Sequence, residues 1–183
     1  MSINLLAAKN REQQLIGLLR KISLFQRLNS RFLQGWLKGA KTRQLKEGER
    51  LCGKGETDTS LFILLKGALE RDEGMCGIRV WNPITSVGET EALIGQPHSG
   101  TIIAREATLL LEIPRRHFLL VLIQDAGTCQ RVCRNLIDML SAQMVEANTR
   151  NEALNRRRTE IAEAVKHAEI ELNDLRMLQS LRA

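Results

Sequence analysis

The pattern of apolar and polar positions divides this 183-residue chain into three parts. In the first part, one apolar series at helical spacing comprises Leu15, Leu18, Leu19 and Ile22. A second series follows at Phe25, Leu28, Phe32, Trp36 and Leu37. Because apolar residues three and four positions apart share one face of a helix, residues 1–40 are predicted to form two short amphipathic helices that pack on the next part.

From Lys41 the pattern changes to short apolar runs separated by glycines. Two of these runs, SLFILL and TLLLEI, have the length of buried strands. Turn signals recur at Gly48, Gly55, Gly67, Gly74, Gly88, Gly95 and Gly100. This spacing is typical of an antiparallel sandwich or barrel, and Pro114 ends the region because proline cannot continue the hydrogen-bond ladder of a strand. Residues 41–124 are therefore predicted to form a β-domain.

The third part, residues 125–183, contains no proline and a single glycine, so it can form one long helix. One apolar series with a seven-residue period comprises Ile137, Met144, Val165 and Leu172, interrupted by Asn151 and Arg158. A second series, three residues later, comprises Leu140, Ala147, Leu154, Ile161, Ala168 and Leu175. The two series match the a and d positions of a coiled coil, and a parallel homodimer is the simplest partner for this helix. The alternative, a helix that packs back on its own domain, accounts only for the first two turns.

Composition excludes two classes of protein. The chain is 43% hydrophobic with a net charge of +6, which is typical of a globular domain rather than a disordered chain. It lacks a run of about 18 apolar residues, so we expect no membrane insertion, and its first residues lack the pattern of a secretory signal. A cytoplasmic protein is therefore expected.

Candidate catalytic and metal-binding residues are few. Cys129 and Cys133 lie four positions apart, yet none of the three histidines is near them, so packed thiols are expected rather than a metal site. His117 and His167 have no nucleophile or carboxylate at a useful spacing and are expected at the surface. Phosphate-loop, nucleophile-elbow and zinc-protease motifs are all missing from the sequence, which indicates a protein that is not an enzyme.

Two segments resemble the cyclic nucleotide-binding domains of the catabolite activator protein type. LCGKGETDTSLFILLKGALE is similar to that family's succession of strand, Gly-Glu turn, strand and Gly turn, and SVGETEALIGQPHSGTIIA is similar to its phosphate-binding cassette. The resemblance covers about residues 10–145 and implies a bacterial regulator. It also implies a mostly β jelly-roll, or double-stranded β-helix, barrel with short N-terminal helices and a long C-terminal helix.

The resemblance assigns roles to residues of the cassette. Glu89 matches the carboxylate that accepts a hydrogen bond from the ribose hydroxyl, and Gly88 matches the glycine that allows close approach before it. Ser99 matches the hydroxyl that contacts the phosphate, and the backbone N–H of Gly100 lies beside it in the family. These four positions support a nucleotide pocket.

Three further cassette residues complete the predicted pocket. Ala92 and Leu93 match its small apolar wall. His98 departs from the family, which has an arginine immediately before the serine. An arginine pairs a phosphate with two hydrogen bonds, whereas an imidazole donates only one toward a ligand, so this exchange is expected to weaken binding by about ten- to a hundred-fold.

Three functions remain open from the sequence. The first is a non-enzymatic sensor that binds cyclic AMP, cyclic GMP or a cyclic dinucleotide, dimerises through its C-terminal helix and signals to a protein partner. The second is a degenerate domain that binds no nucleotide and acts as a dimeric scaffold or adaptor. The third is a DNA-binding transcriptional regulator that uses its basic N-terminal face. Nucleic acid binding is not expected, because the chain after Asp125 has no break that can form a helix-turn-helix and residues 150–183 mix seven basic with six acidic residues.

Overall fold

The computed structural model describes the backbone of residues 2–74 and 77–180, and the side chains of residues 10–74 and 77–172. It divides into two compact units, residues 1–140 and a second unit that begins at Ser141. Across these ranges, none of the helices has both the length and the apolar character that crossing a bilayer demands.

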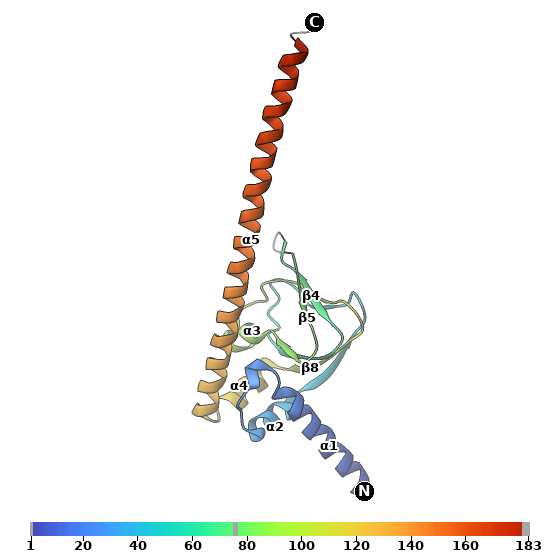
Figure 1. The fold of residues 1–183 in the computed structure, drawn as a ribbon. Coiled ribbons are helices and arrows are strands. Elements are labelled where there is room, and N and C mark those ends of the chain that lie inside the picture. Colours follow the sequence, from blue (N-terminus) through green and yellow to red (C-terminus); the bar gives the residue numbers. More distant parts are fainter. Residues whose placement is uncertain (1, 75–76, 181–183) are drawn as a thin grey trace. The chain divides into compact units, whose positions relative to one another are not determined.

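The first unit contains two antiparallel β-sheets with four strands each among its described residues (Figure 1). Along the chain the strands are β1 (Lys41–Leu45), β2 (Arg50–Cys52), β3 (Leu61–Lys66), β4 (Leu69–Asp72), β5 (Ile78–Trp81), β6 (Thr85–Val87), β7 (Ile102–Ala104) and β8 (Thr108–Ile113). One sheet has the order β1-β8-β3-β6 and the other β2-β7-β4-β5. The predicted jelly-roll-like β-domain with short N-terminal helices and a long C-terminal helix is confirmed.

The helices are α1 (Ser2–Leu19), the short 3₁₀ helix η1 (Ser23–Phe25), α2 (Ser30–Gly39), α3 (Glu89–Ile94), α4 (Arg115–Leu122) and α5 (Ala126–Ser180). The apolar series that begins at Phe25 was predicted to form one helix, but helix α2 begins only at Ser30. Asn29 caps α2, because its side chain accepts a hydrogen bond from the Arg31 N–H at 3.1 Å. Phe25 and Leu28 therefore lie in the preceding turns and are still buried.

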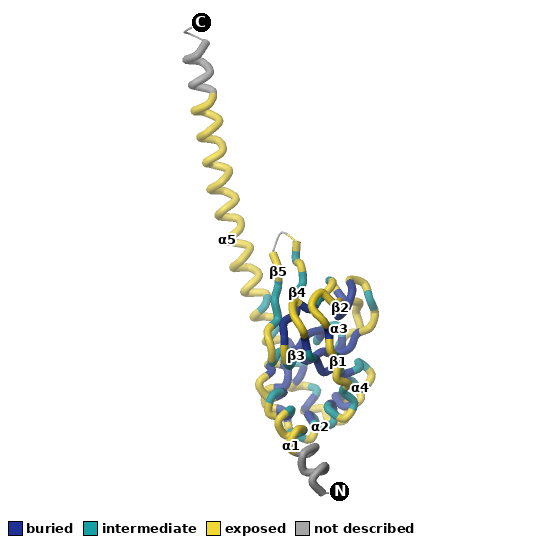
Figure 2. Tube along the Cα trace, turned by 90° about the vertical axis from the view of Figure 1, so that its right-hand side faces the viewer, coloured by how far each residue is buried: buried dark blue, intermediate teal, exposed yellow. Residues whose placement is uncertain are grey.

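Strand β3 is buried on both faces, which explains its unbroken apolar sequence. Leu61 and Ile63 point to the helices that cover the first sheet, whereas Phe62 and Leu64 point to the space between the sheets. Successive side chains of a strand alternate between its faces, so a strand with two covered faces needs apolar residues at every position. Figure 2 shows this buried strand at the centre of the first unit.

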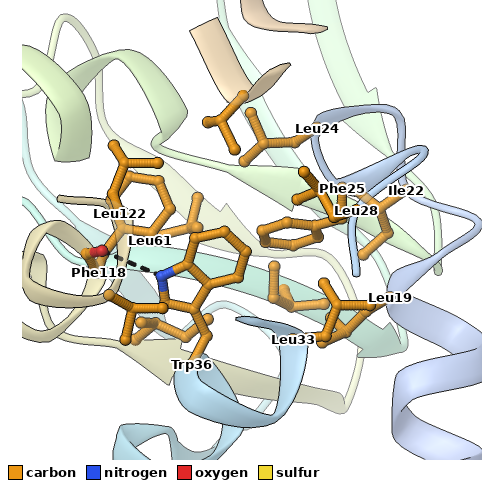
Figure 3. Close-up of a cluster of buried hydrophobic side chains, with 14 of the residues drawn as sticks. Leu19, Ile22, Leu24, Phe25, Leu28, Leu33, Trp36, Leu61, Phe118 and Leu122 are labelled. Atoms are coloured by element: carbon orange, nitrogen blue, oxygen red, sulfur yellow. Dashed lines mark hydrogen bonds between the residues drawn. The ribbon is translucent and has the colours of Figure 1, made fainter. Parts of the chain in front are cut away.

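The helix-side core is centred on Trp36, which is fully buried (Figure 3). Its ring centroid lies 5.2 Å from that of Phe25 and 5.4 Å from that of Phe118. The indole Nε1–H donates a hydrogen bond to the backbone carbonyl of Phe118 at 3.0 Å. This bond and the aromatic packing join α2 to α4 over the outer face of the first sheet.

Helix α5 is continuous from Ala126 to Ser180, as predicted. Its first turns belong to the first unit, where Val132 and Leu136 are buried in the helix-side core. Between Ser141 and residue 172, all described side chains are exposed except the half-buried Gln143 (Figure 2). The exposed apolar side chains include Met144, Leu154, Ile161, Val165 and Leu172 of the two predicted series. The side chain of Leu175 lies outside the described residues.

Candidate functional site

The segment between β6 and β7 carries the predicted site residues. Strand β6 leads into Gly88, which has a φ of 84° and precedes the short helix α3. A Cβ atom at this position would lie 3.0 Å from the backbone oxygen of Ser60. Both the left-handed backbone and this close approach favour glycine. The predicted role of Gly88 as a close-approach residue thus has a local structural cause.

Glu89 is a half-buried carboxyl at the start of α3. The Ser86 hydroxyl donates a hydrogen bond to its Oε1 atom at 2.5 Å. Burial raises the pKa of the Glu89 carboxyl, and the Ser86 hydrogen bond and the positive charge of Arg79 only partly oppose this increase in pKa. The folded protein therefore holds an acidic group here at a cost in stability, which is common at functional sites.

Ala92 and Leu93 belong to the helix-side core of the first unit. Ala92 is fully buried in the helix-side core, and Leu93 is half-buried against that core. Their apolar side chains cover the first sheet, because α3 packs on β3. Both residues thus anchor α3 on the sheet, and their predicted role as the apolar wall of a nucleotide pocket stays a prediction.

His98 is 3% exposed, and its ring contacts the loop between β2 and β3. Its Nε2 atom lies 2.6 Å from the carbonyl oxygen of Asp58. Because a carbonyl only accepts, Nε2 carries the proton in this contact. The backbone of His98 also bonds to the same loop, through Glu56 O at 3.0 Å and the Gly55 N–H at 2.8 Å. A histidine that we expected to face a phosphate thus joins two segments, its own cassette and the loop that contains Gly55, Glu56 and Asp58.

Ser99 and Gly100 contact an arginine that the sequence analysis did not select. The exposed Ser99 hydroxyl accepts a hydrogen bond from Arg71 Nη1 at 3.2 Å. Gly100 does not have a left-handed φ. Instead, a Cβ atom at Gly100 would lie 2.5 Å from Arg71 Cδ. A side chain at position 100 would therefore require the Arg71 side chain to move.

The hairpin of β4 and β5 adds three residues to the site. Arg71 and Arg79 are directly opposite in the antiparallel register. Their guanidinium carbons lie 5.7 Å and 5.0 Å from the ring centroid of Trp81. A signal for Arg71 was present in the sequence. It lies two positions after Leu69, which is buried between the sheets, so both residues belong to the same inward-facing side of β4.

The remaining cysteines and histidines form no site within the described part of the chain. Cys52, Cys129 and Cys133 are free thiols, and no cluster of potential metal ligands is found among the described residues. The fourth cysteine, Cys76, lies outside those residues. His117 is half-buried rather than at the surface, because its Nε2 donates to the Gly35 carbonyl at 2.8 Å.

The comparison with protein families decides the class of this domain. A sequence model described as the cyclic nucleotide-binding domain matches residues 42–125. These residues are a cyclic nucleotide-binding domain. The match confirms the resemblance drawn from the two sequence segments. No curated protein matches the chain.

Solved structures with the same fold include a sensor domain, a catabolite activator protein and a kinase regulatory domain. The sensor domain of the transcriptional regulator DNR from Pseudomonas aeruginosa is 20% identical, with a TM-score of 0.61 over 74% of this chain and 94% of that one. The catabolite activator protein of Thermus thermophilus is 22% identical, with a TM-score of 0.59 over 73% and 63%. The regulatory domain of Toxoplasma gondii PKA, solved with cAMP, is 23% identical, with a TM-score of 0.55 over 61% and 44%. The chain spans less than two thirds of the last two proteins, and identities this low show the shared fold alone.

Proposed function

We propose that the cyclic nucleotide-binding domain of this chain binds a cyclic nucleotide and acts as a sensor without catalytic activity. The observation that carries the proposal is the half-buried Glu89 carboxyl, whose pKa is raised by burial. A protein that needed only stability would favour an uncharged residue here. A ribose hydroxyl that donates a hydrogen bond to this carboxylate would offset the free-energy cost of its burial, since hydrogen bonds to the charged form favour that form.

Titration with candidate ligands tests the proposal. Cyclic AMP, cyclic GMP and cyclic di-GMP are added separately to the full chain, and binding is measured by calorimetry and thermal unfolding. A ligand present at about a hundred times its Kd is expected to raise the free energy of unfolding by about 2.7 kcal/mol. If none of the three changes the unfolding midpoint at millimolar concentration, the domain is a scaffold that binds no nucleotide.

Glu89→Gln is expected to stabilise the free protein. Because the pKa of Glu89 is raised in the folded state, the folded protein retains a proton that the unfolded chain releases as pH rises. The carboxyl therefore lowers the free energy of unfolding above its folded-state pKa and has no such effect below its ordinary value of 4.5. We expect the glutamine variant to be more stable at about pH 7 and equally stable near pH 4, as measured by urea unfolding.

The same variant is expected to bind cyclic AMP about tenfold more weakly, because a neutral amide accepts a weaker hydrogen bond than a carboxylate. Glu91→Gln is the matched control, since Glu91 is a second half-buried acid on α3. It should leave the affinity unchanged. Equal affinity of the Glu89 variant and the parent protein would show that Glu89 does not contact the ligand.

The proposal includes a homodimer formed through α5. The exposed apolar residues of its two heptad series lie on one stripe of the helix, and burying such a stripe requires a second helix. An identical helix supplies the same stripe in the same register. Asn151 and Arg158, at a positions of this stripe, would fix that register at some cost in stability.

Signalling to a protein partner is the output that we propose for this dimer. Residues 150–183 carry seven basic and six acidic residues, a mixture that suits the solvated outside of a coiled coil better than a nucleic acid surface. A gel shift with DNA, repeated at increasing salt concentration, distinguishes the alternative of a DNA-binding regulator.

A further inference from the structure

The phosphate of a cyclic nucleotide carries a negative charge, and the Nε2 atom of His98 is already engaged by the Asp58 carbonyl oxygen at 2.6 Å. An anion beside Ser99 therefore needs a cation from another part of the fold. We propose that Arg71, on β4, binds the phosphate of the ligand together with the Ser99 hydroxyl. This inference rests on the proposed function, because it names the residue that would recognise the charge of that same ligand.

The contact between Arg71 and Ser99 already has the required donors. Arg71 Nη1 donates to Ser99 Oγ at 3.2 Å, so the serine oxygen acts as an acceptor and its own proton remains available. A guanidinium has five N–H donors, and among the described residues Arg71 uses them on Ser99 and Glu73. A phosphate oxygen beside Ser99 can therefore accept one hydrogen bond from the hydroxyl and another from the guanidinium.

Strand pairing places Arg71 at the end of the cassette. Strand β4 pairs with β7 in a register that sets Leu69 opposite Ala104 and Glu70 opposite Ile103. Strand β7 begins at Ile102, two residues after Gly100, so the next residue of β4, Arg71, lies beside the segment that contains Ser99 and Gly100. The close contact between the Arg71 stem and Gly100 agrees with this register, and a larger residue at Gly100 would displace the arginine.

The guanidinium of Arg71 is held in position before any ligand arrives. Glu73 Oε1 lies 2.6 Å from its Nη2 atom, and the Trp81 ring lies beneath it. Arg79, across the hairpin and over the same ring, supplies a second positive charge that offsets the Glu73 carboxylate. An arginine fixed by a carboxylate and an aromatic ring loses less side-chain freedom on binding an anion than a free one.

The test compares a ligand that has a phosphate with one that lacks it. Cyclic AMP and adenosine are titrated into the parent protein, Arg71→Met and Arg105→Met, all as full chains, by calorimetry. Methionine keeps an unbranched apolar stem against Trp81 and Gly100 but removes the charge. Arg105 is the matched control, because it pairs with Glu70 of the same strand at 3.7 Å and is not bonded to the cassette. Thermal unfolding of each variant confirms that it is folded, and Arg71→Lys provides a second, more conservative change.

We expect Arg71→Met to weaken cyclic AMP binding by about ten- to a hundred-fold and to leave adenosine binding unchanged. The cyclic AMP affinity of Arg71→Lys should fall between those of the parent protein and the methionine variant. Lysine keeps the positive charge but cannot donate two parallel hydrogen bonds as a guanidinium does. Arg105→Met should bind both ligands like the parent protein. Cyclic AMP affinity that is unchanged or increased in Arg71→Met would overturn the inference and leave the proposed function intact. A folded parent protein that binds none of cyclic AMP, cyclic GMP and cyclic di-GMP would overturn both.

Discussion

Trp36→Ala is expected to lower the free energy of unfolding by about 3–5 kcal/mol, the largest effect on stability that we predict for a single substitution. Trp36 is fully buried between Phe25 and Phe118, so its removal leaves a cavity lined by aromatic rings. The change also leaves the Phe118 carbonyl without the indole N–H that it accepts. Urea unfolding followed by circular dichroism measures the difference.

Two further variants separate the causes of this loss. Trp36→Phe keeps most of the ring packing but removes the hydrogen bond, and should lower the free energy of unfolding by about 1–3 kcal/mol. Leu120→Ala is the control, because Leu120 lies on α4 near the same core but is 49% exposed, and its loss should change the free energy by less than about 0.5 kcal/mol. Comparable losses for Trp36→Ala and Leu120→Ala would show that α2 does not stabilise the sandwich through Trp36.

Ile161→Asp is expected to convert the proposed dimer into a monomer at micromolar concentration. Ile161 is 57% exposed in the single chain and lies at a d position of the heptad pattern. In a dimer it would contact its own copy, so the substitution would place two carboxylates together in an apolar seam. Sedimentation equilibrium measures the mass of the parent protein and of the variant.

Ile170→Asp is the matched control for the dimer. Ile170 is 50% exposed and also apolar, but it lies outside both heptad series. The same change of residue should therefore leave the dimer intact. Pairing of α5 helices through this stripe would be excluded if the parent protein sediments as a monomer. It would also be excluded if Ile161→Asp and Ile170→Asp dissociate the dimer to the same extent.

The fold could be predicted because it depends on periodicities that are local in the sequence. The run from Leu61 to Leu65 predicted a buried strand, and the regularly spaced glycines predicted turns between strands. The continuity of α5 followed from the missing prolines. The position of α2 was less clear, because one apolar series crosses the boundary that the Asn29 cap imposes.

The candidate site could be predicted only where it lies within one segment. Gly88, Glu89 and Ser99 could be selected as candidates because the cassette is contiguous in the sequence. Arg71 was missed because its contact with Ser99 depends on the pairing of two strands about thirty residues apart. The orientation of His98 also depends on a distant group, the Asp58 carbonyl, which no local pattern specifies.

Because both faces of β3 are covered, a shortened fragment of this protein must keep the covering helices as well as the two sheets. The family match starts at residue 42 and ends at 125, so a fragment cut at those limits would keep the space between the sheets but lose the N-terminal helices and the first turns of α5. Leu61, Ile63 and Ile113 would then be covered only by α3 and α4 and would lose the apolar contacts with the N-terminal helices and α5. We therefore expect the smallest stable fragment to be longer than the matched range 42–125, because it must include the helices that cover β3.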